Sequence, residues 1–198
     1  MTPGTQTPPR PLVAVDLDGT LVDGNTLHLY IRAAIGEMVR GWRVGALGYT
    51  LGMLALRRLG LVSHRTMKFG IFGRIRHTPG LARRFAREAG RRRRADVDAL
   101  IGRLQEGGYE VLLATAAPAQ YVRLLWQGDF VATDMDAATN PGRTECRGDE
   151  KLRRVAAYAA ARGLTLTAAV SDDLTDDAPL LGAVAEAYHV SPCGVRRL

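Results

Sequence analysis

Two aspartates one residue apart, Asp16 and Asp18, are the first residues of this chain whose types and spacing indicate chemistry. They follow the apolar run 12–15, which is typical of a buried strand. Gly19 indicates a sharp turn just beyond, so both carboxylates would lie at the carboxyl edge of a sheet, where open α/β sheets bind ligands. A divalent cation is the natural partner of such oxygens. A surface turn or a calcium loop is the alternative, but four apolar residues before the pair argue against it.

A second group of carboxylates follows another apolar run, residues 166–170. Without a cation, four acids within six residues would repel one another strongly. A solvated acidic loop is the alternative interpretation, and it is weakened because an apolar pattern resumes directly after the group. The four residues are Asp172, Asp173, Asp176 and Asp177.

Two further polar residues carry a weaker signal. Thr115 ends an apolar run, but a hydroxyl in that position is also common as the cap of a following helix. Lys151 lies on the first turn of a predicted helix, where a lysine is ordinarily solvated. Neither residue alone indicates catalysis.

Short apolar segments alternate with helical ones, which predicts βαβ units and a parallel sheet. The gap between the first two strands is too long for one crossover helix, and its periodicity is helical. Strands are expected at 12–17, 110–115, 130–133, 166–171 and 185–190, and helices between them at 119–126, 149–162 and 178–183. Further helices are expected within the gap at 26–35, 44–59, 64–72, 80–90 and 96–104.

The predicted fold class is therefore α/β, with a Rossmann-like parallel sheet core and an inserted α-helical cap after the first strand. Residues 11–23 and 108–198 would form the core, and residues 24–107 the cap. The Pro-, Thr- and Gly-rich residues 1–10 predict a disordered tail. The two cysteines form neither a metal-binding spacing nor a disulfide framework, and no signal peptide is recognisable, which favours a reducing, cytoplasmic setting.

Taken in order, these signals resemble the motifs of the haloacid dehalogenase superfamily of phosphohydrolases. They are Asp-x-Asp-Gly-Thr at 16–20, then Thr115, then Lys151, then the aspartates after residue 171. The long insert resembles the helical cap of the phosphoserine-phosphatase-like branch, and 146–154 resembles a pattern of bacterial members. The resemblance covers residues 12–192. It implies a Mg²⁺-dependent phosphatase that hydrolyses a small phosphomonoester substrate through an aspartyl-phosphate.

The resemblance also assigns the reacting groups. Asp16 is implied to be the nucleophile, and Asp18 the general acid and then the base. Asp16, the main-chain carbonyl of Asp18, and Asp172 are the implied Mg²⁺ ligands. Asp176 would lie behind the metal and orient Lys151 or a metal-bound water.

The phosphoryl group would be held by the remaining motif residues. Thr115 is implied to donate to a phosphoryl oxygen, together with main-chain N–H groups near Leu17 and Ala116. Lys151 would neutralise the charge of the transition state. Asn25 stands where phosphoserine phosphatases carry a glutamate for the substrate's amino group, which argues against phosphoserine. Asp177 is interpreted as an extra residue of the last motif.

The net charge of +7 is concentrated in residues 74–94, which hold nine arginines and one acid. Arginines also flank the uncharged stretch 44–56, which is too short for a membrane span of roughly 20 residues. We expect this stretch to be a buried helix, with Gly41, Gly45, Gly48 and Gly52 spaced for close backbone contact. A weak contact with an anionic membrane surface is the alternative.

Specific nucleic-acid binding is not expected, because Phe85 is the only aromatic residue among the arginines of 74–94. The runner-up function is a non-catalytic protein of the same fold, which would bind a polyanion or an acidic membrane surface through its arginine-rich insert. The sequence does not predict an oligomeric state.

Overall fold

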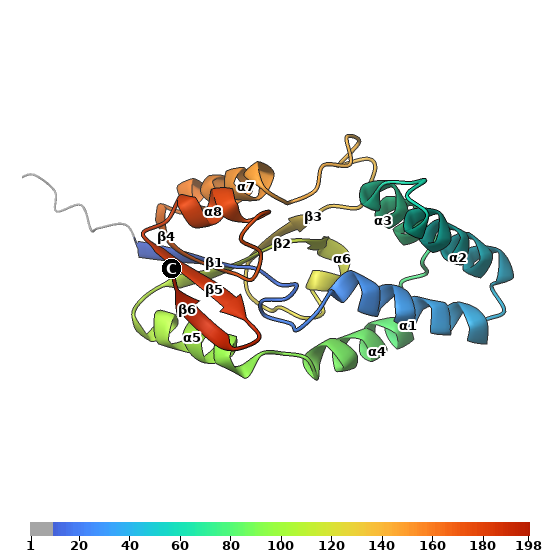
Figure 1. The fold of residues 1–198 in the computed structure, drawn as a ribbon, viewed down its shortest axis with the longest axis horizontal. Helices are drawn as coiled ribbons and strands as arrows, with labels where there is room; N and C mark the ends of the chain where they lie inside the picture. The colour runs from blue at the N-terminus through green and yellow to red at the C-terminus, as the bar shows by residue number, and fades with distance from the viewer. Residues whose placement is uncertain (1–9) are drawn as a thin grey trace, which may run out of the picture.

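The computed structural model describes residues 10–198, which form one six-stranded sheet with the strand order β3-β2-β1-β4-β5-β6 (Figure 1). Strands β1 to β5 run parallel, and β6 pairs with β5 in the antiparallel direction. The predicted α/β class is confirmed. The bounds are β1 (Arg10–Val15), β2 (Glu110–Pro118), β3 (Phe130–Thr133), β4 (Leu164–Ser171), β5 (Glu186–Ser191) and β6 (Gly194–Arg197).

Two predictions about the ends of the chain need comment, one for the C-terminal strand and one for residues 1–10. The short strand β6 was not predicted, because its apolar content is low. The predicted disordered tail lies outside the described residues except for Arg10, which begins β1.

The central strand β1 is buried on both faces, as parallel sheets require. Because side chains alternate along a strand, Leu12 and Ala14 face one layer while Val13 and Val15 face the other. Figure 1 shows α7 (Asp149–Ala161) and α8 (Ala178–Gly182) on one side of the sheet and α5 (Ala95–Glu106) on the opposite side. The two apolar clusters that result fix the direction in which the strand ends point.

The insert between β1 and β2 is helical, as predicted. It contains α1 (Thr26–Arg40), α2 (Val44–Arg58), α3 (His64–Phe72) and α4 (Pro79–Gly90). Figure 1 shows these helices extending together beyond one edge of the core. The chain leaves and re-enters the core at one place, where Asp23 N donates to Arg92 O at 2.8 Å and Arg94 N donates to Leu21 O at 3.0 Å.

The predicted C-terminal boundary of the cap, residue 107, is wrong. Helix α5 follows the return of the chain and packs against β2 and β6 rather than against the insert helices. The reason is its apolar face, since Val97, Leu100 and Ile101 are buried in the sheet layer. The insert therefore ends near Arg92.

An aromatic cluster anchors the insert to the core. Tyr121 of the short helix α6 (Ala119–Val122) is fully buried, and its ring centroid lies 4.9 Å from those of Tyr30 and Phe85. The hydroxyl of Tyr121 is 3.0 Å from Thr26 Oγ1 at the start of α1. Since α6 directly follows β2, this cluster fixes the insert beside the carboxyl end of that strand.

Residues 44–56 form a helix as predicted, but the prediction that this helix is buried is wrong. Only Thr50 and Met53 of α2 are buried. No heavy atom lies within 4 Å of a Cβ built on Gly45, Gly48 or Gly52, so no backbone approaches these glycines. Helix α2 contacts α1 and α3 on one side and leaves its other side exposed. Among residues 10–198, no helix is long and apolar enough to cross a membrane.

Candidate active site

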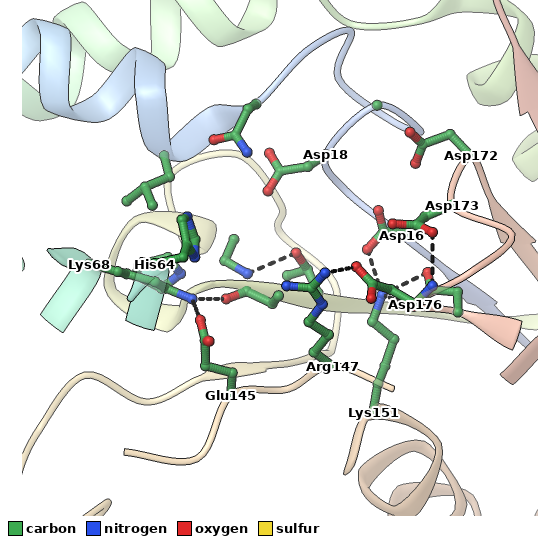
Figure 2. A pocket seen from close by; sticks show the side chains of 18 of the residues that line it. Asp16, Asp18, His64, Lys68, Glu145, Arg147, Lys151, Asp172, Asp173 and Asp176 are labelled. Carbon is green, nitrogen blue, oxygen red and sulfur yellow. Dashed lines mark hydrogen bonds and ion pairs between the residues drawn. The ribbon is translucent and has the colours of Figure 1, made fainter. Parts of the chain in front are cut away.

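The carboxyl ends of β1, β2 and β4 open into one cavity of about 580 Å³. The insert supplies the opposite wall with Arg57, His64 and Lys68, and Figure 2 shows Lys68 entering across from Lys151. Every residue that the sequence nominates lines this cavity. These residues are Asp16, Asp18, Asn25, Thr115, Ala116, Lys151, Asp172 and Asp176.

A tight loop after β1 presents Asp16 and Asp18 to the cavity. Asp16 N donates to Val170 O at 2.9 Å, which ties the end of β1 to β4. Gly19 has φ +76° and donates its N–H to the carbonyls of Val22 and Gly24. Asp18 Oδ1 accepts from Thr26 N at 2.5 Å, at the start of α1. Asp16 is buried and Asp18 is half-buried, so the first aspartate is the more enclosed of the two.

Lys151 joins two buried carboxylates. Its Nζ lies 2.8 Å from Asp16 Oδ1, and 2.7 and 2.8 Å from the two oxygens of Asp177. Burial raises the pKa of Asp16 to about 7, while the ammonium of Lys151 acts in the opposite direction and the charge of Asp177 adds to the rise. Burial alone would lower the pKa of Lys151, but Asp16 and Asp177 raise it above its ordinary value. The amine therefore stays charged beside Asp16.

Asp172 is fixed against the loop of the first two aspartates. Its Oδ1 accepts from Thr20 Oγ1 at 2.9 Å, and its N–H donates to the same hydroxyl oxygen at 2.8 Å. A Cβ on Gly19 would lie only 2.0 Å from Asp172 Oδ2. Glycine is therefore required at position 19 both by its positive φ and by this close approach.

Of the two roles expected for Asp176, the contact with Lys151 is wrong, whereas the orientation of a metal-bound water stays a prediction. Asp177, interpreted from the sequence as an extra residue, holds that position and also accepts from Ser171 Oγ at 2.6 Å. Asp176 instead forms an ion pair with Arg147. The turn between β4 and α8 explains the shift, because Asp173 Oδ1 accepts from the N–H groups of Thr175 and Asp176, at 2.8 Å each.

Thr115 and Ala116 lie where β2 bends away from β3. Thr115 is buried, and its Oγ1 accepts from Ala117 N at 3.0 Å, which leaves its hydroxyl hydrogen free to donate. Ala116 O accepts from Thr133 Oγ1 at 2.7 Å. Asn25 lines the cavity, but its Oδ1 caps α1 by accepting from His28 N at 3.1 Å.

An ion pair that the sequence does not predict links the insert to the core. Lys68 of α3 is buried, and its Nζ donates to Ala116 O at 2.6 Å and to Glu145 Oε1 at 2.5 Å. Burial lowers the pKa of Lys68, although the bond to Glu145 opposes this shift. The only signal in the sequence is one lysine among the apolar residues 67–72. Glu145 gives no signal at all, since it lies in an irregular loop.

The oxygen atoms at this strand edge fit a magnesium ion. Mg²⁺ takes one or two protein carboxylates and keeps several waters, which suits Asp16, Asp172 and the main-chain carbonyl of Asp18. Burial raises the pKa of both Asp18 and Asp172 because their ionised forms lose solvation, and a bound cation would stabilise those ionised forms. Within residues 10–198 no three His, Cys, Asp or Glu side chains are grouped to hold a metal by themselves. The carbonyl, waters and substrate oxygens would therefore complete the coordination.

The described residues thus form a Rossmann-like parallel sheet whose carboxyl edge carries aspartates, a hydroxyl and a buried lysine, with a helical insert beside it. Residues 13–181 match the family model of the haloacid dehalogenase-like hydrolases, and the chain belongs to this family. The resemblance stated from the motifs is confirmed. A comparison with the curated proteins finds no match.

Solved structures share the whole architecture. A protein of unknown function from Bordetella pertussis Tohama I is 23% identical, with a TM-score of 0.68 over 93% of this chain and 92% of that one. A phosphoserine phosphohydrolase-like protein from Francisella tularensis subsp. tularensis SCHU S4 is 15% identical, with a TM-score of 0.54 over 89% and 85%. A substrate-bound phosphoserine phosphatase is 14% identical, with a TM-score of 0.55 over 92% and 86%. At these identities the likeness shows a shared fold, which two phosphoserine-phosphatase-like proteins also have.

Proposed function

We propose that this protein is a magnesium-dependent phosphatase that hydrolyses a small phosphomonoester through an aspartyl-phosphate on Asp16. The observation that carries the proposal is the contact of Lys151 Nζ with Asp16 Oδ1 at 2.8 Å, in a cavity that Asp18 and Thr115 also line. A carboxylate held beside a permanent positive charge can meet a second anion, the phosphate, with less repulsion.

In the first step, an oxygen of Asp16 attacks phosphorus and the bond from phosphorus to the leaving oxygen breaks. Asp18 donates a proton to that leaving oxygen. Burial raises the pKa of Asp18, which favours the protonated form that an acid requires. The bond from Thr26 N to Asp18 Oδ1 holds the carboxyl group in place.

The phosphoryl oxygens are bound by groups on the other strands. Thr115 donates its free hydroxyl hydrogen, and Lys151 offsets the charge that spreads over the oxygens in the transition state. Mg²⁺, when bound, would neutralise the charge shared by the aspartates and the phosphate.

In the second step, Asp18 has lost its proton and acts as a base. It takes a proton from a water that attacks phosphorus, and the bond between Asp16 and phosphorus breaks. Inorganic phosphate leaves, and both aspartates return to their starting protonation states. The same carboxyl group thus serves both steps, as its position beside Asp16 allows.

The compartment is part of the proposal. Cys146 and Cys193 are both free thiols, which supports a reducing, cytoplasmic setting.

Hydrolysis of p-nitrophenyl phosphate tests the proposal, with the purified protein assayed in Mg²⁺ and again after chelation by EDTA. We expect turnover that requires Mg²⁺ and that is lost in Lys151→Met. Absence of turnover in Mg²⁺ across a panel of phosphorylated metabolites would favour the runner-up, a non-catalytic binding protein of the same fold.

A further inference from the structure

The exposed apolar side chains of this protein gather along one helix of the insert, α2, and beside its two ends. Among the described residues, ten large hydrophobic side chains are exposed, and seven of them lie on α2, in the last turn of α1 or in the turns that flank α2. We call these seven the apolar patch. They are Val39, Trp42, Val44, Leu51, Leu56, Leu59 and Leu61. A soluble protein seldom leaves so many apolar side chains together without a partner.

The outer face of α2 has the spacing of a continuous apolar stripe. Val44, Leu51 and Ala55 lie on it with the glycines at 45, 48 and 52, and none of these six residues is buried. Trp42 stands at the head of the stripe with 87% of its surface exposed and a φ of +52°, a conformation that bulky residues seldom adopt. The stripe therefore combines large apolar side chains at Trp42, Val44 and Leu51 with exposed glycines between them.

Positive charge predominates around the patch, since Glu37, which pairs with Arg40 at 2.7 Å, is the one acid from residue 24 to residue 87. No Asp or Glu occurs from residue 38 to residue 87. Arginines lie on both sides of α2: Arg40 ends α1, Arg43 directly precedes α2, Arg57 and Arg58 are in its last turn, and Arg65 is in the first turn of α3. Apolar side chains bordered by arginines are the combination that holds a protein at the surface of an anionic bilayer.

We propose that the apolar patch docks this protein on an anionic lipid bilayer, with α2 lying in the plane of the interface. The apolar stripe would enter the boundary of the lipid headgroups while the arginines contact lipid phosphates. Trp42 is suited to this position, since its ring is apolar and its N–H remains able to bind polar groups.

A second copy of this chain is the competing occupant, and charge argues against it. Any pairing of two α2 helices along their outer faces would bring the arginines of both chains together. Glu37, which already pairs with Arg40, is the one acid from residue 24 to residue 87 that could compensate them. An anionic bilayer supplies that compensation, and a second copy does not.

The arginines at 91–94 are not part of this surface, although the sequence had singled them out. Arg91 and Arg92 pair with Glu88, Arg93 pairs with Asp98, and Arg94 pairs with Asp96. These pairs lie where the chain re-enters the core.

The docking surface and the cavity share an edge. Arg57 in the last turn of α2 and His64 at the start of α3 both line the cavity. Docking through the apolar patch would therefore bring the rim of the cavity close to the bilayer.

Trp42 gives a direct readout, because the chain has only two tryptophans. Trp126→Phe leaves Trp42 as the single tryptophan. We expect its emission to move to shorter wavelength with vesicles of phosphatidylglycerol and phosphatidylcholine, and the protein to co-sediment with them. Vesicles of phosphatidylcholine alone should produce neither effect, and high salt should weaken both.

Two pairs of variants, each with a matched control, separate the apolar from the charged contribution. Val44→Gln with Leu51→Gln should abolish co-sedimentation, whereas Leu124→Gln with Leu198→Gln should not. Arg58→Gln with Arg65→Gln should weaken binding, by roughly fivefold per arginine, whereas Arg103→Gln with Arg196→Gln should not. Equal recovery with anionic and neutral vesicles would overturn the proposal. So would a dimer in light scattering that Val44→Gln with Leu51→Gln converts to monomer.

Discussion

Lys151 Nζ lies 2.8 Å from Asp16 Oδ1, although 135 residues separate the two in the sequence. Helix α7 delivers the lysine and strand β1 delivers the aspartate, and the sheet brings both to one edge. The contact leaves one carboxylate of the pair Asp16 and Asp18 directly compensated by a fixed charge. This difference supports the proposed roles, in which Asp16 is the nucleophile and Asp18 is the acid.

Substitution of each aspartate should separate the two roles. Asp16→Asn should remove turnover and leave the fold intact, because the amide is nearly isosteric but a poor nucleophile. Asp18→Asn should slow turnover by about 10²–10⁴-fold through loss of the acid and base. Steady-state kinetics and circular dichroism would measure both effects. Wild-type activity in Asp16→Asn would rule out the assignment of the nucleophile.

Asp177 and its neighbour Asp176 offer a matched pair for stability. Asp177→Asn leaves Lys151 with one carboxylate fewer in a buried site, and loss of one partner of a buried pair costs about 3–5 kcal/mol. Asp176→Asn breaks an ion pair with Arg147 that is partly exposed, and such pairs contribute about 0–1 kcal/mol. Denaturant unfolding would measure both. Equal losses in the two variants would contradict the placement of Asp177.

Gly19 and Gly60 test the close approach of Asp172. Both glycines have positive φ, at +76° and +74°, so alanine at either should cost about 1–2 kcal/mol of folding free energy. Only Gly19→Ala places a Cβ within 2.0 Å of Asp172 Oδ2, whereas nothing lies within 4 Å at Gly60. We therefore expect phosphatase activity, and its stimulation by Mg²⁺, to be lost in Gly19→Ala but retained in Gly60→Ala. Full activity in that variant would show that Asp172 can move without consequence.

The two thiols should differ in reactivity with pH. Burial raises the pKa of Cys146 to about 11, and Cys193 is exposed. Since the thiolate is the reactive form, a raised pKa leaves Cys146 almost wholly protonated at pH 8, and its thiolate fraction grows about tenfold per pH unit up to about 11. An aromatic disulfide reagent at pH 8 should titrate one thiol in the folded protein and two in denaturant. Rapid labelling of both in the folded state would contradict the burial of Cys146.

Phosphoserine should not be the preferred substrate. Asn25 lacks the carboxylate that an ammonium group requires, and its Oδ1 already caps α1. A survey of phosphorylated metabolites would measure kcat/KM for each. The highest value for phosphoserine would contradict the expectation, and Asn25→Glu is expected to raise that value.

The five parallel strands and the motif residues could be predicted from the sequence, because parallel strands are short apolar runs and polar residues at their carboxyl ends meet at one edge. The antiparallel strand β6 could not, because its apolar content is low. The position of Asp177 could not, since it depends on the turn that Asp173 builds with the main chain. The number of residues in such a turn is not visible in hydrophobic periodicity.

The contacts that the insert helices make could not be predicted from the sequence either. Helix α2 looks like a buried helix by composition, yet its partners lie on one side only. Lys68 and Glu145 are 77 residues apart, and their pairing depends on how the insert closes over the core. Patterns along one helix predict which face is apolar but not what covers it.

Detection of the aspartyl-phosphate tests directly whether Asp16 is the nucleophile. In Asp18→Asn, p-nitrophenolate can leave without a proton from the enzyme, while the water of the second step has lost its base. We expect a burst of p-nitrophenolate and, after an acid quench, one phosphoryl group on the peptide that contains Asp16 by mass spectrometry. The same experiment in Asp16→Asn should give neither burst nor adduct. Product release from wild-type protein and from Asp18→Asn with no phosphorylated Asp16 would contradict the account.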